Sequence, residues 1–172
     1  MILDQNLRLG NTGTITAAGT YITGTSGTPD VVDLQSNTAY TATASGTLYT
    51  VGQGTQNRDI GSGNDLYVMF TVTTALAGGT NATFQVVASS SSTLASGNIV
   101  IGETSPIVLA NLGLGAQVAV RINPQQIGAA GLRYLGAQVV TTGTHTAGVI
   151  SADIVEDIQD GRRIYASGFT VA

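Results

Sequence analysis

Apolar residues occupy every second position in several short stretches of the chain. In residues 66–73, one face would carry Leu66, Val68, Phe70 and Val72, and the other Met69, Thr71 and Thr73. This alternation is typical of a β-strand with one buried face. No window of a dozen residues keeps an apolar period of 3.6 residues, so the pattern predicts no amphipathic helix.

A β-hairpin is predicted directly after this stretch, with Gly78-Gly79 at its tip and residues 83–88 as its second strand. Further strands are predicted at 99–101, 107–109, 117–123, 133–141 and 146–155, and weaker ones at 15–23, 31–34 and 38–51. Short alternating strands separated by Gly, Pro and Asn favour an all-β fold, a jelly-roll or Greek-key antiparallel β-sandwich. No fixed repeat period supports a solenoid.

The length of 172 residues predicts a single domain, residues 1–172. Residues 1–13 are interpreted as an N-terminal arm. Residues 35–57, rich in Thr, Ala, Gly and Tyr and free of Pro, are interpreted as an inserted β-flap. Residues 157–172, which follow the last good strand, are interpreted as an extended C-terminal arm.

Charge is scarce: six arginines, no lysine and ten acidic residues leave a net charge of −4, and only 9% of residues are charged. An ordinary domain has about 25%. Without a basic patch we expect no nucleic-acid partner. The absence of cysteine excludes disulfides and thiolate chemistry. No apolar run is long enough to span a membrane, and the N-terminus has no basic leader region, so we expect a soluble protein that folds in a cytoplasm.

Catalytic and cofactor motifs are not found, and we predict neither an enzyme nor a cofactor. His145, the only histidine, lies in a Thr-Gly-Thr-His loop without a nucleophile motif, which favours a polar turn residue over a catalytic base. The glycine pairs at 52–54 and 113–115 lack the Lys and the helix of a phosphate loop, which makes them turns.

Acidic residues cluster at the end of the last predicted strand and just after it, at Asp153, Glu156, Asp157 and Asp160. Oxygen ligands at this density could hold Ca²⁺, but no EF-hand pattern is present, so the cluster favours a solvated strand end and we predict no metal site. Glu103 and Glu156 are the only glutamates available to a glycosidase, which makes an enzyme acting on polysaccharide a third-ranked alternative.

Several motifs resemble the capsid cement proteins of tailed bacteriophages. They are the opening MILD, residues 58–68 (RDIGSGNDLYV), residues 78–80 (GGT), residues 131–135 (GLRYL) and the closing YASGFTV. The resemblance covers about the first ten residues and then residues 58–172, whereas residues 35–57 are longer than that family's pattern. It implies a jelly-roll protein that forms oligomers on the outside of the head and bridges subunits of the major capsid protein, with no activity or cofactor.

The expected function is therefore that of a virion protein, a capsid cement or decoration protein on the outer surface of a phage head. Its expected partners are the major capsid protein and further copies of itself, as a dimer or trimer at symmetry axes. The alternative is a receptor-binding or fibre-associated β-sandwich of the virion. The residues expected to contact the shell are Ile2, Leu3, Leu7, Arg162, Arg163, Tyr165 and Phe169, with Asp153, Glu156 and Asp157 as partners for shell arginines.

Overall fold

The computed structural model describes residues 8–22, 24–25, 28–34, 40–44, 47–51, 65–95, 97–123 and 132–156. Within these ranges the regular structure is β-strand, apart from one short 3₁₀ helix, η2 (Leu109–Asn111). No helix among the described residues has the length and apolar character needed to cross a membrane. The predicted all-β fold is confirmed.

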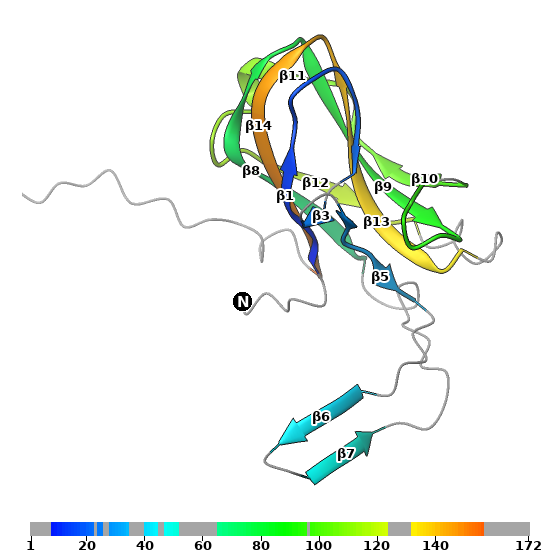
Figure 1. Cartoon of the computed structure of the whole chain (residues 1–172). Coiled ribbons are helices and arrows are strands. Elements are labelled where there is room, and N and C mark those ends of the chain that lie inside the picture. The colour runs from blue at the N-terminus through cyan, green and yellow to red at the C-terminus, as the bar shows by residue number, and fades with distance from the viewer. Residues whose placement is uncertain are drawn as a thin grey trace, which may run out of the picture.

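Two main antiparallel sheets face each other (Figure 1). The first sheet has the order β1 (Arg8–Thr14), β14 (His145–Val155), β8 (Tyr67–Gly78) and β12 (Gln117–Arg121). The second has the order β10 (Ile99–Glu103), β9 (Asn81–Ser89), β13 (Tyr134–Thr142) and β2 (Gly19–Ile22). Two short strands extend it, because β11 (Ile107–Val108) pairs with β9 and β5 (Val32–Asp33) pairs with β13.

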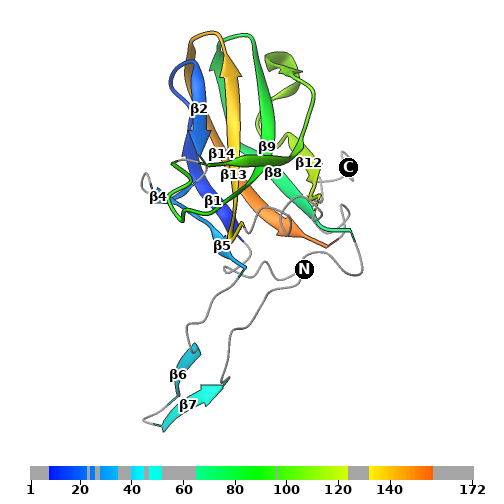
Figure 2. The same cartoon turned by 90° about the vertical axis from the view of Figure 1, so that its right-hand side faces the viewer.

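The connectivity of these eight strands is that of a jelly roll. Numbered along the chain, the first sheet contains strands 1, 8, 3 and 6, and the second contains strands 2, 7, 4 and 5. Consecutive strands lie in opposite sheets except for β9 and β10, and the chain wraps around one core. The hairpin predicted for residues 66–88 is therefore wrong, because β8 and β9 are joined by the turn at Gly78-Gly79 but pair with strands of different sheets. Figure 2 shows the second sheet with β13 and β9 at its centre.

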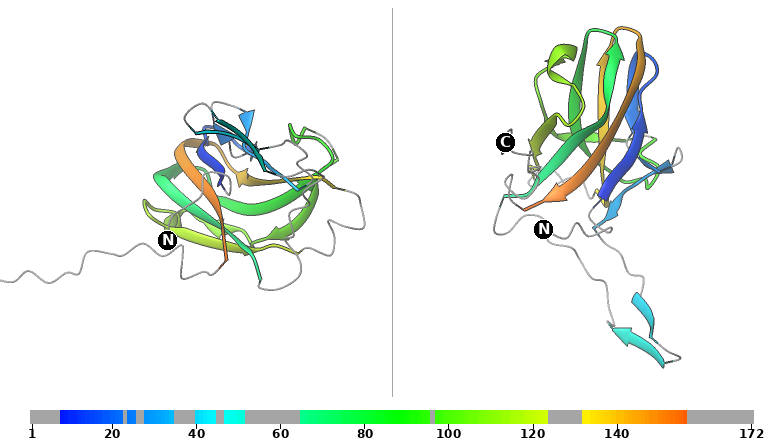
Figure 3. Two further views of the ribbon diagram at one scale, coloured as in Figure 1. Left: turned by 90° about the horizontal axis from the view of Figure 1, so that it is seen from below. Right: turned by 90° about the vertical axis from the view of Figure 1, so that its left-hand side faces the viewer.

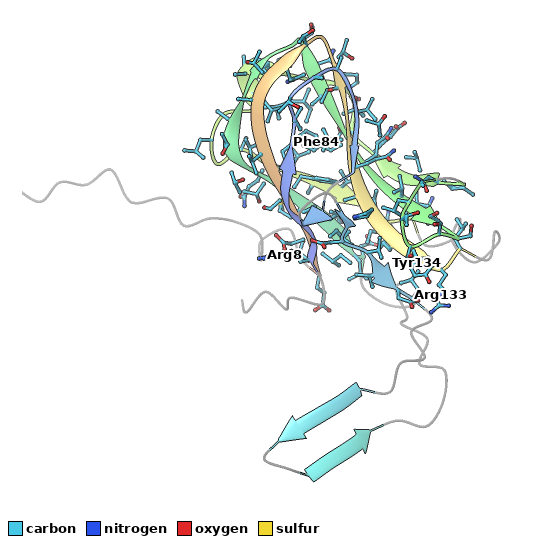
Figure 4. The ribbon with its side chains drawn as sticks, viewed as in Figure 1. Arg8, Phe84, Arg133 and Tyr134 are labelled. Atoms are coloured by element: carbon cyan, nitrogen blue, oxygen red, sulfur yellow. The ribbon has the colours of Figure 1, made fainter. Side chains whose placement is uncertain are left out.

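The core lies between the two sheets and is formed by the residues that the alternation predicted. Phe70 of β8 and Phe84 of β9 are both 0% exposed, and their ring centroids are 5.1 Å apart. Figure 4 shows Phe84 between the sheets. Val120, Ile122, Leu135, Ala137 and Val139 are buried in the same cluster. Because both phenylalanines come from central strands of different sheets, their contact joins the two layers.

One pair of sheet edges is closed by a backbone contact. The Asn123 N–H donates to the carbonyl oxygen of Ile101 at 3.1 Å, which links the chain after β12 to β10. Gly102 of β10 approaches the Arg121 carbonyl so closely that a Cβ atom would collide with it. The two sheets therefore meet along this seam, as the view from below indicates (Figure 3, left).

The sandwich has two distinct ends. Tyr67 of β8 pairs with Val155 of β14, and Tyr134 of β13 pairs with Ser89 of β9, at one end. The other end carries the β8–β9 turn at Gly78-Gly79, the β13–β14 turn and η2. Figure 3 (right) shows β8 and β14 running between these ends.

The N-terminal prediction needs a correction. Residues 1–13 were predicted as an arm, yet Arg8–Thr14 forms β1, which pairs with β14, and Leu9 is 0% exposed. Polar and glycine residues in this stretch hid the strand from the alternation test, since Leu9 is its one strongly apolar residue before Ile15. Residues 1–7 and the predicted C-terminal arm, residues 157–172, lie outside the described residues.

Within the predicted insertion, residues 35–57, the structure describes one hairpin. Its strands are β6 (Tyr40–Ala44) and β7 (Thr47–Val51), which pair only with each other among the described residues. A second small hairpin, β3 (Gly24–Thr25) with β4 (Thr28–Pro29), precedes it. Both lie between the second and third strands of the jelly roll in chain order.

Candidate functional site

The structure describes two of the ten residues expected to contact the shell, Asp153 and Glu156. The others lie outside the described residues and stay predictions: Ile2, Leu3, Leu7, Asp157, Arg162, Arg163, Tyr165 and Phe169. Glu156 is exposed directly after β14 ends. The described part of the site must therefore be built from the side chains around these two positions.

Asp153 is not the solvated carboxylate that the acidic cluster predicted. It faces Arg8 across the β1–β14 ladder, and the Arg8 Nε lies 3.2 Å from Asp153 Oδ1. The Asp153 side chain is only 13% exposed. Burial raises the pKa of this carboxyl, while the hydrogen bond and charge of Arg8 oppose the rise without cancelling it. Asp153 therefore has a partner inside its own chain.

Two further ion pairs lie at the same end of the sandwich. Arg133 donates from Nε to Asp33 Oδ1 at 2.7 Å and from Nη2 to Asp33 Oδ2 at 2.6 Å. Its guanidinium carbon also lies 5.2 Å from the centre of the Tyr134 ring (Figure 4). The Asp33 carboxylate raises the pKa of Arg133 above its ordinary value. This bidentate pair fixes β5 against the start of β13.

The third pair joins Arg121, the last residue of β12, to Asp65 just before β8, with 2.6 Å between Nη2 and Oδ1. The two side chains are 65% and 50% exposed. An ion pair this open to water contributes little to stability, typically about 0 to 1 kcal/mol. Its side chains are therefore available to an outside partner at small cost.

These pairs make one end of the sandwich charged. We call it the charged end and define it by Arg8, Asp30, Asp33, Asp65, Arg121, Arg133, Asp153 and Glu156. Of the described charged residues, Glu103 alone lies elsewhere, opposite Gln85 near the middle of β9. The described residues of this end, three arginines and five acidic residues, have a net charge of 3 − 5 = −2.

The opposite end, with residues 76–81, 108–116 and 141–147, contains no Asp, Glu, Lys or Arg, and we call it the uncharged end. Val108 and Leu114 are exposed there by 54% and 71%. His145 lies at its centre as the first residue of β14 and is 0% exposed, so it is not the turn residue that the sequence indicated. Neither ring nitrogen has a hydrogen-bond partner in the described structure.

An open groove of about 590 Å³ lies on the outer face of the second sheet. It is lined by Thr83, Gln85, Glu103, Thr104, Ser105, Pro106 and Val140. Gln138 donates to Gln85 at 2.7 Å, and Gln85 donates to Glu103 at 3.0 Å, which forms a polar row across three strands. Hydroxyls, amides and one carboxylate can bind a polar ligand, but the lining offers no second carboxylate for glycoside hydrolysis.

Metal ligands do not gather in the described part of the chain, where no three His, Asp or Glu side chains could share an ion. The comparison with known families adds one finding. The Bbp16 family model matches residues 16–154. The chain belongs to the Bbp16 family. No curated protein matches it.

The Bbp16 match covers some of the candidate residues and not others. It begins at residue 16, after β1, and ends at residue 154, one residue before β14 ends. It includes Asp33, Asp65, Arg121, Arg133 and Asp153, and it spans the predicted insertion at residues 35–57. The predicted arm residues 1–7 and 157–172 lie outside it, so Bbp16 membership does not bear on them.

The ion pairs were missed at the sequence level, although a signal for them was present. Residues 66–102 and 134–152 contain no Asp, Glu, Lys or Arg. Arg133 and Asp153 flank the second of these stretches, and Arg121 ends the uncharged stretch 104–120. All three are therefore expected at strand ends in an antiparallel sandwich with strands of about ten residues, although Glu103 also falls among them. The spacing thus predicts charges at strand ends, but neither which end of the sandwich nor which partners.

Proposed function

We propose that this Bbp16-family chain is a structural protein of a phage head, a cement protein that binds the outer surface of the capsid and bridges neighbouring subunits of the major capsid protein. The observation that carries the proposal is the strand order, which forms the jelly roll that the resemblance to capsid cement proteins implies. Jelly rolls recur in viral capsid domains.

The chemistry of the described residues supports a binding role over an enzymatic one. His145 is enclosed and has no side-chain partner, so it is not placed to activate a nucleophile. The groove on the second sheet contains Glu103 as its one carboxylate. These observations favour the structural role over the polysaccharide-degrading alternative.

The proposal includes self-association at symmetry axes and assembly after synthesis in the host cytoplasm. Repetition over the shell means that each copy needs only a modest interface, since a copy or oligomer that touches two subunits gains effective concentration for its second contact. A standard contact of about 1,600 Å² would be enough for specific binding. No nucleic acid, membrane or cofactor is part of the proposal.

A density map of intact particles tests the proposal against the fibre alternative. The expected result is density for this chain outside the shell, between subunits, in a copy number close to that of the shell protein. Heads that lack the chain should break at lower temperature, and added purified protein should restore their resistance. Density restricted to the tail, or equal heat resistance with and without the chain, would contradict the proposal.

A further inference from the structure

Glu103 differs from the other charged residues that the structure describes. It is exposed at the end of β10, away from the charged end. The three ion pairs among the described residues join arginines to aspartates, and none of them includes Glu103. Its hydrogen bond is to a neutral group, because the Gln85 amide donates to Glu103 Oε2 at 3.0 Å. No basic side chain of the described structure therefore neutralises this carboxylate.

The Glu103 carboxylate is oriented by a row of side chains. Gln138 of β13 donates to Gln85 Oε1 at 2.7 Å, and Gln85 in turn donates to Glu103. The strand register aligns the row, since Gln85 lies opposite Gln138 on one side and opposite Glu103 on the other. The row contacts Oε2, which leaves Oε1 to accept from a ligand. A carboxylate oriented in this way loses little further rotamer freedom when it binds.

The groove beside Glu103 is complementary to a long cationic side chain. It lies over β9, between Val140 of β13 and residues 104–106, which connect β10 to β11. Two hydrogen bonds hold that connection against β9: the Thr104 N–H donates to the Phe84 carbonyl at 3.0 Å, and the Phe84 N–H donates to Thr104 Oγ1 at 3.1 Å. Apolar atoms of the lining can contact the methylene groups of an arginine, while the carboxylate and the lining hydroxyls accept from its guanidinium.

We propose that this groove binds the Arg162-Arg163 pair of a second copy, so that C-terminal segments are exchanged between copies. The inference rests on the self-association that the proposed function includes, and it names the site and the segment. Charge complementarity selects the occupant. The sequence has no lysine, and its arginines outside the described residues are Arg58 and this adjacent pair. Arg58 is joined to described strands on both sides, whereas residues 157–172 are joined to the sandwich at one end and can extend to a neighbour.

The length of the segment favours a second copy over the groove of the same chain. Five residues separate Glu156 from Arg162, a reach of about 20 Å when extended. The path to the chain's own groove crosses two sheets, about 10 Å apart, and then follows β9 from its end as far as Gln85 on the outer face. Asp157 and Asp160 balance the two arginines, so the segment has no net side-chain charge. The attraction is therefore a local contact between individual groups.

Sedimentation of the purified full chain over a concentration series measures the dissociation constant of self-association. An exposed ion pair typically changes an affinity by up to about fivefold, and exchange between two copies forms the pair twice. Glu103→Gln, which keeps the shape of the side chain, should therefore raise the dissociation constant about tenfold, as should Arg162→Gln combined with Arg163→Gln. Arg58→Gln is the matched control and should stay within about twofold of the wild type. Circular dichroism confirms that each variant is folded.

A charge swap provides the decisive comparison. Glu103→Arg combined with Arg162→Glu and Arg163→Glu should restore self-association, whereas Glu103→Arg alone should not. An unchanged dissociation constant for Glu103→Gln or for the double arginine variant would overturn the inference, as would a loss with Arg58→Gln alone. Glu103→Gln protein that self-associates normally but no longer binds heads would assign the groove to a shell arginine instead, and would leave the cement function standing. A wild-type chain that self-associates as expected but does not bind heads would overturn the cement function alone.

Discussion

The charged end and the uncharged end hold their strands together by different interactions. At the charged end, Arg8, Arg121 and Arg133 each connect two chain segments through a side-chain ion pair. At the uncharged end, the strands are connected by tight turns that pack on one another, with the Thr80 N–H donating to the Thr142 carbonyl at 2.8 Å. Backbone hydrogen bonds join segments at both ends, such as that from the Leu34 N–H to the Arg133 carbonyl at the charged end, but among the described residues only the charged end adds side-chain ion pairs.

This difference predicts where substitutions will be tolerated. Exposed ion pairs contribute little to stability because water competes for both partners. Substitutions at close backbone contacts are tolerated less well, because an added methyl group would collide with neighbouring atoms. Substitutions in the exposed Arg121–Asp65 pair should therefore be tolerated better than substitutions of the glycines in the turns of the uncharged end.

The largest loss of stability is expected for a substitution in the core between the two sheets. It is the reference for the smaller losses expected at the two ends. Phe70→Ala removes the ring that packs 5.1 Å from Phe84. It should lower the free energy of unfolding by about 3 to 5 kcal/mol, measured by urea titration. Thr74→Ala, an exposed position on the same strand, is the control and should change it by no more than about 0.5 kcal/mol.

The second-largest loss of stability is expected for a substitution at the uncharged end. Gly79 has a φ of +72°, and a Cβ atom there would collide with the His145 ring. Gly79→Ala should cost about 2 to 4 kcal/mol from backbone strain and overpacking. Gly113→Ala, which would meet no atom within 4 Å, is the matched control.

The source of this cost can be isolated by a double-mutant cycle. In a His145→Ala background the collision is removed, so Gly79→Ala should destabilise the protein less than it does in the wild type. Equal costs in both backgrounds would show that the ring is not what restricts residue 79.

The charged end should give a smaller, salt-dependent effect. Arg133→Lys keeps the charge but loses the bidentate geometry toward Asp33, so it should lower stability by less than Gly79→Ala does. The difference from wild type should shrink in about 1 M salt, which screens exposed charges. A salt-independent loss as large as that of Gly79→Ala would remove the distinction between the two ends.

The smallest effect is expected at Asp153. Burial raises its pKa above the ordinary value of 3.8 in the folded protein, so its contribution to stability is fully present below 3.8 and is lost as pH rises through the folded pKa. Asp153→Asn does not titrate. Relative to this variant, the wild type should therefore lose stability as pH rises from 3.8 through the folded pKa of Asp153.

Near neutral pH the Asp153→Asn variant should be about as stable as the wild type, despite the weakened contact with Arg8. Urea titrations at a series of pH values measure both stabilities. A variant that is clearly less stable at neutral pH would show that the Arg8 pair outweighs the cost of burying the carboxylate.

Much of the fold could be predicted from the sequence because burial on one face forces alternation. Val68, Phe70 and Val72 were expected in the core and are all 0% exposed. The outer face was less predictable: Met69 and Thr71 point away from the core, yet they are 5% and 8% exposed. Alternation states which face a residue lies on, but not whether neighbouring side chains such as Asp153, opposite Met69, cover that face.

The site was less predictable than the fold, for a different physical reason. Arg133 and Asp33 are 100 residues apart in the sequence, and Arg8 and Asp153 are 145 apart. Such pairs depend on strand register across the sheets, which a single sequence does not state. The prediction for His145 was wrong because polar residues and Gly143 surround it in sequence, whereas its buried ring packs against Gly79 in another turn.

The seam between β10 and β12 bears on how this protein behaves at high concentration. With 9% charged residues, mutual repulsion offers weak protection against self-association. An open β10 edge would present unpaired amides to other chains, the usual starting point for sheet extension into aggregates. The bond from Asn123 to Ile101 and the close approach of Gly102 to the Arg121 carbonyl cover part of that edge. Backbone closure at this seam thus reduces the strand edge that is open to pairing with other chains, in a protein that has little surface charge.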